Sequence, residues 1–305
     1  MELHITGLSK TYANGVRALD DVNLSIPTGM FGLLGPNGAG KSTLMRTLAT
    51  LQDADHGSAQ LIDAGPGTHL NILRDKAGVR RVLGYLPQDF GVYPKVNAED
   101  MLDHLARLKG LADRFERKAA VETLLRQTNL WDVRRSALGG FSGGMRQRFG
   151  IAQALLGRPR LIIVDEPTAG LDPEERTRFH NLLVEIGEEV IVLLSTHIVS
   201  DVSDLCPNLA IMNRGRVLAT GTPKQLTDAL AGRIWQTAVD RHAVAALQAE
   251  HTVISTRLFS GKTRLHVLAD ASPGPGFAAV EATLDDAYFA TIGGRSAATA
   301  SAVAA

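Results

Sequence analysis

The sequence carries no excess of charge of either sign: 32 Lys plus Arg balance 32 Asp plus Glu among 305 residues. Proteins that bind DNA or RNA along its backbone usually carry a basic excess, because phosphate neutralisation supplies most of the binding free energy. We therefore expect no nucleic-acid partner. Charged residues at 21% and hydrophobic residues at 45% are typical of a globular chain.

Cysteine and long hydrophobic runs are scarce as well. The single cysteine, Cys206, can form no disulfide within the chain, which fits a reducing compartment and a small buried residue better than a nucleophile. The longest apolar runs, Leu161 to Val164 and Val190 to Leu194, have the length of strands, whereas a membrane-spanning helix needs about 20 residues. The first residues lack a basic stretch followed by an apolar core. We therefore expect neither a signal peptide nor a membrane-spanning segment.

The apolar patterns along the chain predict an α/β fold. Residues 3 to 26 alternate polar and apolar positions around a turn, which is typical of antiparallel strands. A short apolar strand at 31 to 34 then runs into a glycine-rich turn and a helical segment. The two apolar runs beyond residue 160 indicate buried parallel strands, joined by a helix over 173 to 187. We expect a mixed or parallel core sheet with an N-terminal antiparallel β subdomain.

The remaining segments suggest a division into domains. Helical spacing over about 97 to 157 predicts a helical subdomain inserted into the sheet domain. Beyond residue 221, short strands around a helix predict a small C-terminal α+β module. We expect a main domain over 1–228, an accessory domain over 229–290, and a disordered tail rich in Ala and Ser over 291–305.

A glycine-rich string after the strand at 31 to 34 fits the phosphate-loop pattern G-x-x-x-x-G-K-[ST]. Such a loop turns backbone N–H groups toward phosphate oxygens, and the following helix adds its positive N-terminal end. A chance turn that contains Lys and Ser is the alternative, and the flanking strand and helix disfavour it. This motif predicts a P-loop NTPase, with Lys41 on the β- and γ-phosphates and the Ser42 hydroxyl on Mg²⁺. The expected nucleotide-binding residues here are Gly35, Pro36, Asn37, Gly38, Ala39, Gly40, Lys41, Ser42 and Thr43.

Two adjacent carboxylates, Asp165 and Glu166, end the apolar run at 161 to 164. A carboxylate beside a buried strand is costly unless a cation compensates it. We expect Asp165 to bind Mg²⁺ and Glu166 to polarise the water that attacks the γ-phosphate. On its own, a strand-ending turn before Pro167 would be the better interpretation; the phosphate loop reverses that preference.

A third motif, Ser142-Gly143-Gly144, lies between the helical segment and the two carboxylates. With the other motifs it resembles the signature of the ATP-binding cassette family, although Phe141 and Met145 stand where that family usually has Leu and Gln. In the family, the signature of one cassette contacts the γ-phosphate held by the phosphate loop of another. The resemblance therefore implies ATP, Mg²⁺ and a second ATPase subunit, with Ser142, Gly143 and Gly144 at the nucleotide.

The same resemblance gives roles to three further residues. Tyr12 resembles the aromatic residue that stacks on adenine, and Gln88 resembles the glutamine that reaches Mg²⁺ and the attacking water. His197 resembles the histidine that contacts the γ-phosphate and orients Glu166. Without the resemblance, Tyr12 would be a packed strand residue, Gln88 an ordinary polar loop residue after Pro, and His197 a strand-end residue, although the position of His197 beside the carboxylates favours function.

Several histidines lie outside these motifs. His56, His104 and His180 have neither ligand spacing nor carboxylates nearby in sequence, and we expect them on the surface.

The resemblance covers residues 3 to about 225, and within the family the segments at 143–148 and 283–288 resemble ATPase subunits of multidrug or antibiotic exporters of the ABC-2 type. It implies a Mg-dependent ATPase that lies in the cytoplasm on the inner face of the cell membrane. The chain is expected to form a homodimer and to power a separate transmembrane permease, for export.

Two other functions are compatible with parts of the pattern. A soluble cassette protein acting on ribosomes or chromosomes usually has two cassettes or a long coiled coil, and this sequence has one phosphate loop and no heptad run. A regulatory module that does not hydrolyse ATP is disfavoured by Glu166 and His197. The transported substrate, a pairing with a homologous chain and the role of the C-terminal module stay open.

Overall fold

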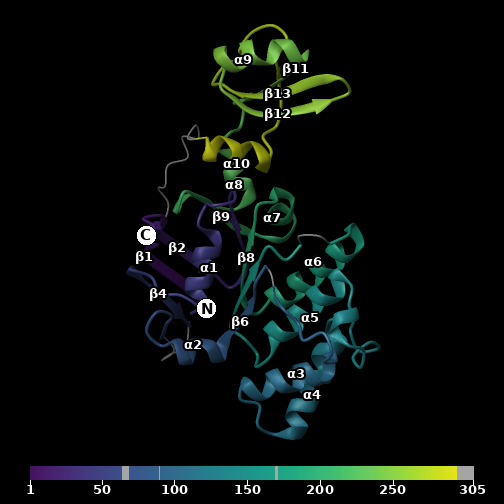
Figure 1. Ribbon diagram of the computed structural model, residues 1–305. Helices are drawn as coiled ribbons and strands as arrows, with labels where there is room; N and C mark the ends of the chain where they lie inside the picture. The colour runs from purple at the N-terminus through teal and green to yellow at the C-terminus, as the bar shows by residue number, and fades with distance from the viewer. Residues whose placement is uncertain (64–68, 89, 169–170, 294–305) are drawn as a thin grey trace.

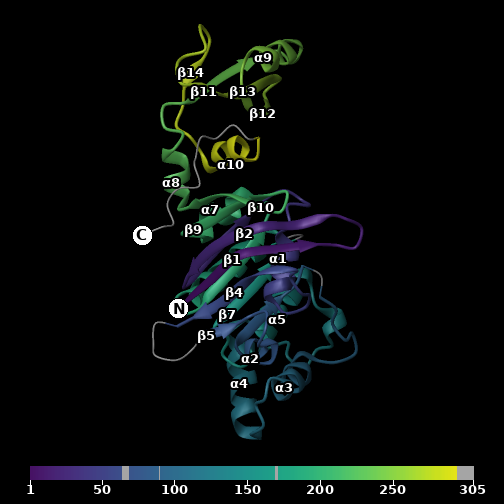
Figure 2. The same ribbon diagram turned by 90° about the vertical axis from the view of Figure 1, so that its left-hand side faces the viewer.

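The computed structural model describes residues 1–63, 69–88, 90–168 and 171–293 (Figure 1). These residues form three β-sheets. Two sheets pack in the main body, and the third lies beyond it with the C-terminal part of the chain (Figures 1 and 2). A group of helices extends from the opposite end of the main body.

The largest sheet forms the centre of the main body. Its strands β3, β6, β7, β8 and β9 are parallel to their neighbours, while β10 pairs with β9 in the antiparallel sense. The expected α/β fold class with a mixed core sheet is thereby confirmed. In spatial order the strands are β10 (Arg216–Gly221), β9 (Asn208–Asn213), β3 (Gly29–Leu34), β8 (Ile191–Thr196), β7 (Leu161–Asp165) and β6 (Leu83–Leu86).

The apolar character of the central strands follows from burial on both faces. On β7, Leu161 and Ile163 face one hydrophobic cluster, while Ile162 and Val164 face another. Successive side chains of a strand point to opposite faces, so a strand covered on both sides is apolar at every position.

The N-terminal sheet covers one face of the core sheet (Figure 2). Its strands are antiparallel, and their inward residues share a cluster with β3 and with α1 (Lys41–Leu48). In spatial order they are β2 (Arg17–Pro27), β1 (Glu2–Thr11), β4 (His56–Ile62) and β5 (His69–Asn71).

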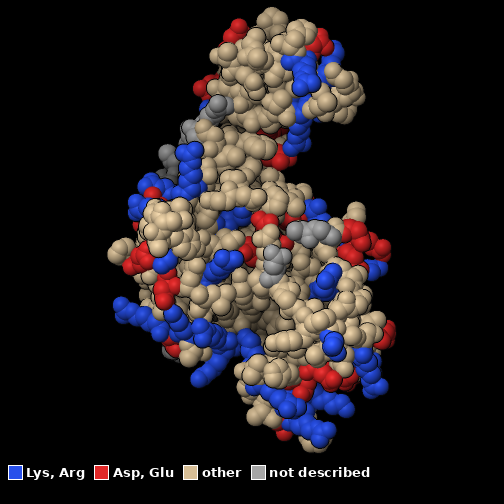
Figure 3. Space-filling model, viewed as in Figure 1, with Lys and Arg blue, Asp and Glu red and all other residues tan. Residues whose placement is uncertain are grey.

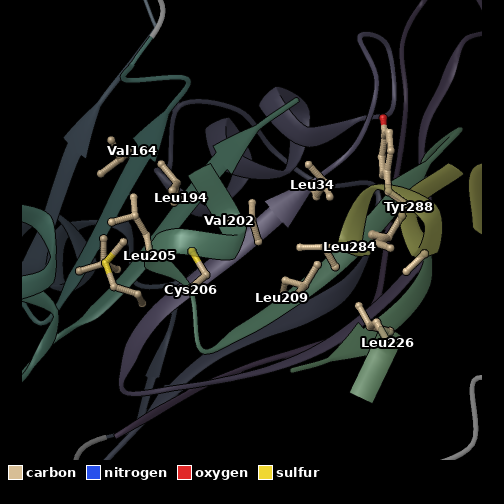
Figure 4. Packing of buried hydrophobic residues seen from close by; sticks show 14 of the residues in the cluster. Leu34, Val164, Leu194, Val202, Leu205, Cys206, Leu209, Leu226, Leu284 and Tyr288 are labelled. Atoms are coloured by element: carbon tan, nitrogen blue, oxygen red, sulfur yellow. The ribbon is translucent and has the colours of Figure 1, made fainter. Parts of the chain in front are cut away.

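Helices cover the other face of the core sheet. Its cluster brings together α6 (Pro173–Gly187), α7 (Val199–Leu205), α8 (Pro223–Asp228) and α10 (Leu284–Ile292). Figure 4 shows Leu284 and Tyr288 of α10 in the same hydrophobic cluster as Leu209 of β9, Val202 of α7 and Leu34 of β3. The last helix therefore packs in the same core as the central strands.

The helical part lies at the end of the main body away from the C-terminal sheet (Figure 1). It has a hydrophobic cluster of its own, which includes Leu102, Leu125, Phe141 and Phe149. Its helices are α3 (Ala98–Leu108), α4 (Arg114–Gln127), a 3₁₀ turn (Leu138–Gly140) and α5 (Gly143–Leu155); the short α2 (Lys76–Val82) precedes β6.

The C-terminal sheet has the spatial order β12 (Val253–Phe259), β13 (Lys262–Leu268), β11 (Ile234–Val239), β14 (Ala278–Ala279). A 3₁₀ turn (Arg241–Ala243) and α9 (Val244–Glu250) follow β11. The tail expected over 291–305 lies outside the described residues from 294 onward, and α10 continues to Ile292.

The surface carries both signs of charge. Figure 3 shows Lys and Arg interspersed with Asp and Glu over the viewed face, in keeping with the balanced composition. Among the helices of the described ranges, none is both long enough and apolar enough to span a bilayer.

Candidate functional site

The phosphate-loop residues lie between the end of β3 at Leu34 and the start of α1 at Lys41. Gly40 caps α1 with φ of 103°, and a Cβ atom built there would lie 2.3 Å from the carbonyl oxygen of Ala18. Only glycine fits both the left-handed backbone and this close approach. The loop therefore delivers the N-terminus of α1, with its free N–H groups, to the edge where the parallel strands end.

Lys41 is held inside the site, with 5% of its surface exposed. Its Nζ donates hydrogen bonds to the carbonyl oxygens of Gly35 at 2.7 Å and Pro36 at 3.2 Å, and it lies 3.9 Å from Oε1 of Glu166. Burial lowers the pKa of Lys41, and the nearby Glu166 and Asp165 carboxylates offset part of this effect. The Lys41 ammonium group thus lies beside the loop, and the Glu166 and Asp165 carboxylates lie near it.

Glu166 follows β7 in a left-handed backbone conformation, with φ of 48°. For a residue other than glycine this conformation costs about 1–3 kcal/mol, and such strain is concentrated at functional sites. Its N–H donates to the carbonyl oxygen of Ser195 at 3.0 Å. The carboxylate lies between two other candidates: Oε1 is 3.1 Å from Nδ1 of His197, and Oε2 is 3.5 Å from Nε2 of Gln88. The structure therefore brings Lys41, Gln88, Glu166 and His197 together.

Asp165 ends β7 with 3% of its surface exposed and accepts a hydrogen bond from the Ser195 hydroxyl. Its carboxylate oxygens, the Ser42 hydroxyl and the Gln88 side-chain oxygen are the hard oxygen ligands that Mg²⁺ prefers. The chemistry of these three side chains suits Mg²⁺; Ser42 and Gln88 line the cavity over the phosphate loop, whereas Asp165 lies behind its wall and is not a lining residue.

A cavity of about 650 Å³ opens over the phosphate loop. Its volume lies within the usual range for small-molecule and cofactor sites, roughly 300–1,000 Å³. Tyr12 lies at its wall, where the hydroxyl is 3.2 Å from Oγ1 of Thr43 and donates to Oε1 of Gln52 at 3.2 Å. The lining residues are Tyr12, Val16, Arg17, Ala18, Asn37, Gly38, Ala39, Gly40, Lys41, Ser42, Thr43, Gln88, Glu166 and Arg214.

Four of these lining residues were not predicted from the sequence. Val16 comes from the connection between β1 and β2, Arg17 and Ala18 are the first residues of β2, and Arg214 comes from the turn between β9 and β10. None belongs to a motif. Arg214 has φ of 48°, and the Arg-Gly turn that follows β9 is the one local sign that the chain bends sharply there.

The signature residues do not join this cavity. Ser142 caps α5 and accepts a hydrogen bond from the N–H of Met145 at 3.1 Å. Ser142 and Gly143 are exposed, while Gly144 is buried. Within one chain the signature therefore exposes its serine and first glycine at the surface, outside the cavity over the phosphate loop.

One histidine expected on the surface is instead largely buried. The His180 side chain is 12% exposed, and Nε2 lies 3.3 Å from Oδ1 of Asp201. The expectation was wrong because His180 of α6 contacts Asp201 of α7, a contact between two helices that sequence spacing does not reveal.

Comparison with known proteins identifies the family. Residues 19–169 match the family model described as ABC transporter. The daunorubicin/doxorubicin resistance ATP-binding protein DrrA of Streptomyces peucetius is 33% identical over 93% of this chain and 81% of its own length. The chain belongs to the ABC transporter family. Its membership confirms the resemblance seen in the motifs and places the chain among the cassette ATPases.

Two further matches extend over the cassette. The probable multidrug ABC transporter ATP-binding protein YbhF of Escherichia coli is 38% identical over 66% of this chain, which spans only 34% of YbhF. A solved ATP-binding cassette, a dimer in a post-hydrolysis state with ADP and Pi, has a TM-score of 0.63 and 25% identity, and covers 72% of this chain and 98% of its own. The fold of this ABC family member is thus that of a cassette solved with hydrolysis products.

Proposed function

We propose that this chain is the ATP-hydrolysing subunit of an ABC exporter. The observation that carries the proposal is the position of Glu166, whose carboxylate lies between Lys41, Gln88 and His197 beside a nucleotide-sized cavity. A base must be close to the proton that it removes, and a developing negative charge needs cations already in place.

In this proposal the reaction is in-line attack of water on the γ-phosphate, which breaks the bond between the γ-phosphorus and the oxygen bridging to the β-phosphate and releases ADP and inorganic phosphate. Glu166 accepts the proton of the water, and His197 holds the Glu166 carboxylate in place through the 3.1 Å contact. Lys41 and the N–H groups of the loop stabilise the charge that develops on the phosphate oxygens. Mg²⁺, when held by Ser42, Asp165 and Gln88, would neutralise further phosphate charge.

The proposed active form is a dimer of two such chains. The exposed Ser142 and Gly143 lie outside the cavity that holds the phosphate loop, so they are free to complete the site of a second chain. ATP sandwiched in this way makes contacts that the open dimer lacks, and only such differential contacts can shift a conformational equilibrium. The similar solved cassette is a dimer, which supports this part of the proposal.

The proposed partner is a separate membrane permease, which would hold the chain at the inner face of the cell membrane, and the proposed direction is export. The name of DrrA refers to drug resistance and that of YbhF to multidrug transport, which favours export. No observation favours the alternative of a soluble protein acting on ribosomes or chromosomes, and the balanced charge argues against it.

Glu166→Gln tests the catalytic part. The variant keeps the size of the side chain but cannot act as a base, so ATP binding should persist while turnover falls by about 100-fold or more. The trapped ATP should shift the chain toward a dimer in size-exclusion chromatography. Glu189→Gln, the same change at an exposed residue, is the matched control. Hydrolysis by Glu166→Gln at the parent rate would exclude Glu166 as the base.

Purification of the chain from membranes tests the partner. We expect a co-purifying membrane protein, and its association should survive washing with salt. Recovery of ribosomes in place of a membrane protein would refute the transport proposal.

A further inference from the structure

Asp201 is a fully buried carboxylate on α7, outside the cavity over the phosphate loop. One of its oxygens, Oδ2, accepts hydrogen bonds from the hydroxyls of Thr168 at 2.7 Å and Thr196 at 3.3 Å. The other, Oδ1, accepts a hydrogen bond from the Arg176 guanidinium and lies 3.3 Å from Nε2 of His180. Both oxygens therefore have partners.

The partners of Asp201 come from three different elements. Thr168 lies two residues after Glu166, in the segment that follows β7, and Thr196 is the last residue of β8, directly before His197. Arg176 is on α6. One carboxylate thus connects the segments that carry Glu166 and His197 to the two helices behind them.

A buried carboxylate is tolerated only when it is paired. Taking it out of water costs several kcal/mol unless hydrogen bonds and a cation compensate it. Burial alone would raise the pKa of Asp201, but the contacts from His180, Thr168 and Arg176 outweigh that effect and hold its pKa below the usual value. The Asp201 carboxylate is therefore ionised at neutral pH, and in this form its oxygens can accept from the surrounding donors.

Strand pairing positions Glu166 and His197 only up to a point. The last residue pair between β7 and β8 is Asp165 with Ser195, and the Glu166 N–H bonds to Ser195 just beyond it. Glu166 then adopts its left-handed conformation, which persists only where the surroundings hold it firmly. Beyond the ladder, the hydroxyls of Thr168 and Thr196 converge on Asp201.

We propose that Asp201 is a positioning residue for ATP hydrolysis, which sets the distance between Glu166 and His197 by holding Thr168 and Thr196 on one carboxylate oxygen. The inference rests on the proposed function, because it assigns Asp201 to the reaction that Glu166 and His197 perform. Asp201 acts through these residues and touches neither nucleotide nor water.

The competing explanation is that Asp201 only joins α6 to α7 through Arg176. The two explanations differ at the threonines. If Asp201 serves only the helices, the Thr168 hydroxyl is dispensable for catalysis. If it positions Glu166, that hydroxyl is required.

The experiment measures kcat and KM for ATP, ATP affinity and melting temperature on the full chain. In Asp201→Asn, the side-chain NH₂ group would face groups that are themselves hydrogen-bond donors, so the contacts of the carboxylate are lost. We expect kcat to fall by about 10-fold to 100-fold, which corresponds to the loss of a hydrogen bond to a charged group, while KM changes by less than about 3-fold. Asp204→Asn, the same change at an exposed position of α7, should keep the parent rate.

Thr168 supplies a second pair of variants in case Asp201→Asn folds poorly. Thr168→Val keeps the shape of the side chain and removes the hydroxyl, so kcat should fall, whereas Thr168→Ser keeps the hydroxyl and should restore most of it. In a His197→Ala background, Asp201→Asn should have little further effect, because the geometry that it supports is already lost.

The outcomes separate the inference from the function on which it rests. A parent chain without ATPase activity would overturn the proposed function, and the inference with it. An active parent with parent-like kcat in Thr168→Val and in Asp201→Asn would overturn the inference alone. Full additivity of Asp201→Asn with His197→Ala, or failure of Thr168→Ser to restore what Thr168→Val loses, would equally overturn it in favour of the helix-joining role.

Discussion

The two glycines of the signature are adjacent, yet their surroundings differ. A Cβ atom built on Gly144 would lie 2.3 Å from Oε2 of Glu175, whereas one built on Gly143 would meet no atom of the described chain within 4 Å. Alanine at the two positions should therefore have opposite effects on the stability of the folded chain.

The expected magnitudes follow from the neighbours of Glu175. Its carboxylate lies 3.5 Å from Arg148 and 3.6 Å from Arg178, and the Arg148 side chain is only 10% exposed. Gly144→Ala must push the carboxylate away from this buried cation, at a cost of about 1–3 kcal/mol. Gly143→Ala removes a flexible residue from the first turn of a helix, which is neutral or stabilising by up to about 0.5 kcal/mol.

Thermal and urea unfolding measure the difference. Gly144→Ala should be less stable than Gly143→Ala by about 2 kcal/mol, and its melting temperature should be lower by about 4 °C or more. In a Glu175→Ala background the cost of Gly144→Ala should vanish, because the added methyl group then has room. Equal stability of the two alanine variants, or a cost that persists without Glu175, would refute this reasoning.

The same pair of variants also tests the proposed dimer. Gly143 is exposed at the surface of the chain, where a second chain would bring its nucleotide in the proposed dimer. Gly143→Ala should therefore lower ATPase activity although the chain stays as stable as the parent. Unchanged activity in this variant would contradict a close approach of nucleotide to Gly143.

Three further predictions concern single residues. If the Tyr12 ring stacks on adenine, Tyr12→Phe should keep ATP affinity within about 3-fold and Tyr12→Ala should lower it by about 5-fold to 100-fold; equal losses in a binding titration would assign the contact to the hydroxyl instead. Burial, together with the charge of Asp201, raises the pKa of the Cys206 thiol to about 12. Thiol reagents at pH 8 should therefore label Cys206 in urea but not in buffer. Rapid labelling in buffer would contradict the burial of this thiol. Burial would raise the pKa of Asp286, but hydrogen bonds from His266 and Thr283 hold it below its usual 3.8. The ionised carboxylate therefore stabilises the fold above pH 3.8, and this stabilisation is lost as the pH falls through the folded-state pKa. Asp286→Asn should flatten the acid side of a plot of unfolding free energy against pH, and an unchanged slope would contradict this role.

Local motifs were predictable from the sequence, and long-range contacts were not. The phosphate loop and the Asp165-Glu166 pair are each written in a few consecutive residues beside an apolar strand, so their chemistry follows from composition and order. Arg214 lines the same cavity, but only the pairing of β9 with β3 brings its turn there. The left-handed backbone of Glu166 likewise has no sign in the sequence.

The buried charged groups could not be predicted from the sequence either. Asp201 lies on a short helix that also carries Ser200, Ser203 and Asp204, and nothing in this local sequence marks it as buried. It is buried because Arg176 and His180 of α6 and two strand-end threonines converge on it. His180 was misplaced for the same reason. A buried ionic group depends on partners that are distant in sequence, so hydrophobic periodicity cannot reveal it.

The position of α10 has a consequence for the order in which the chain folds. Leu284, Ala287 and Tyr288 complete a hydrophobic cluster whose other members include Leu209 and Leu226 of the main body. During synthesis the core strands emerge from the ribosome well before α10, and domains generally fold as units from the N-terminal end. The cassette therefore spends the interval with an open hydrophobic face. A chaperone could bind this face, which is covered only after the segment Leu284–Ile292 has been made.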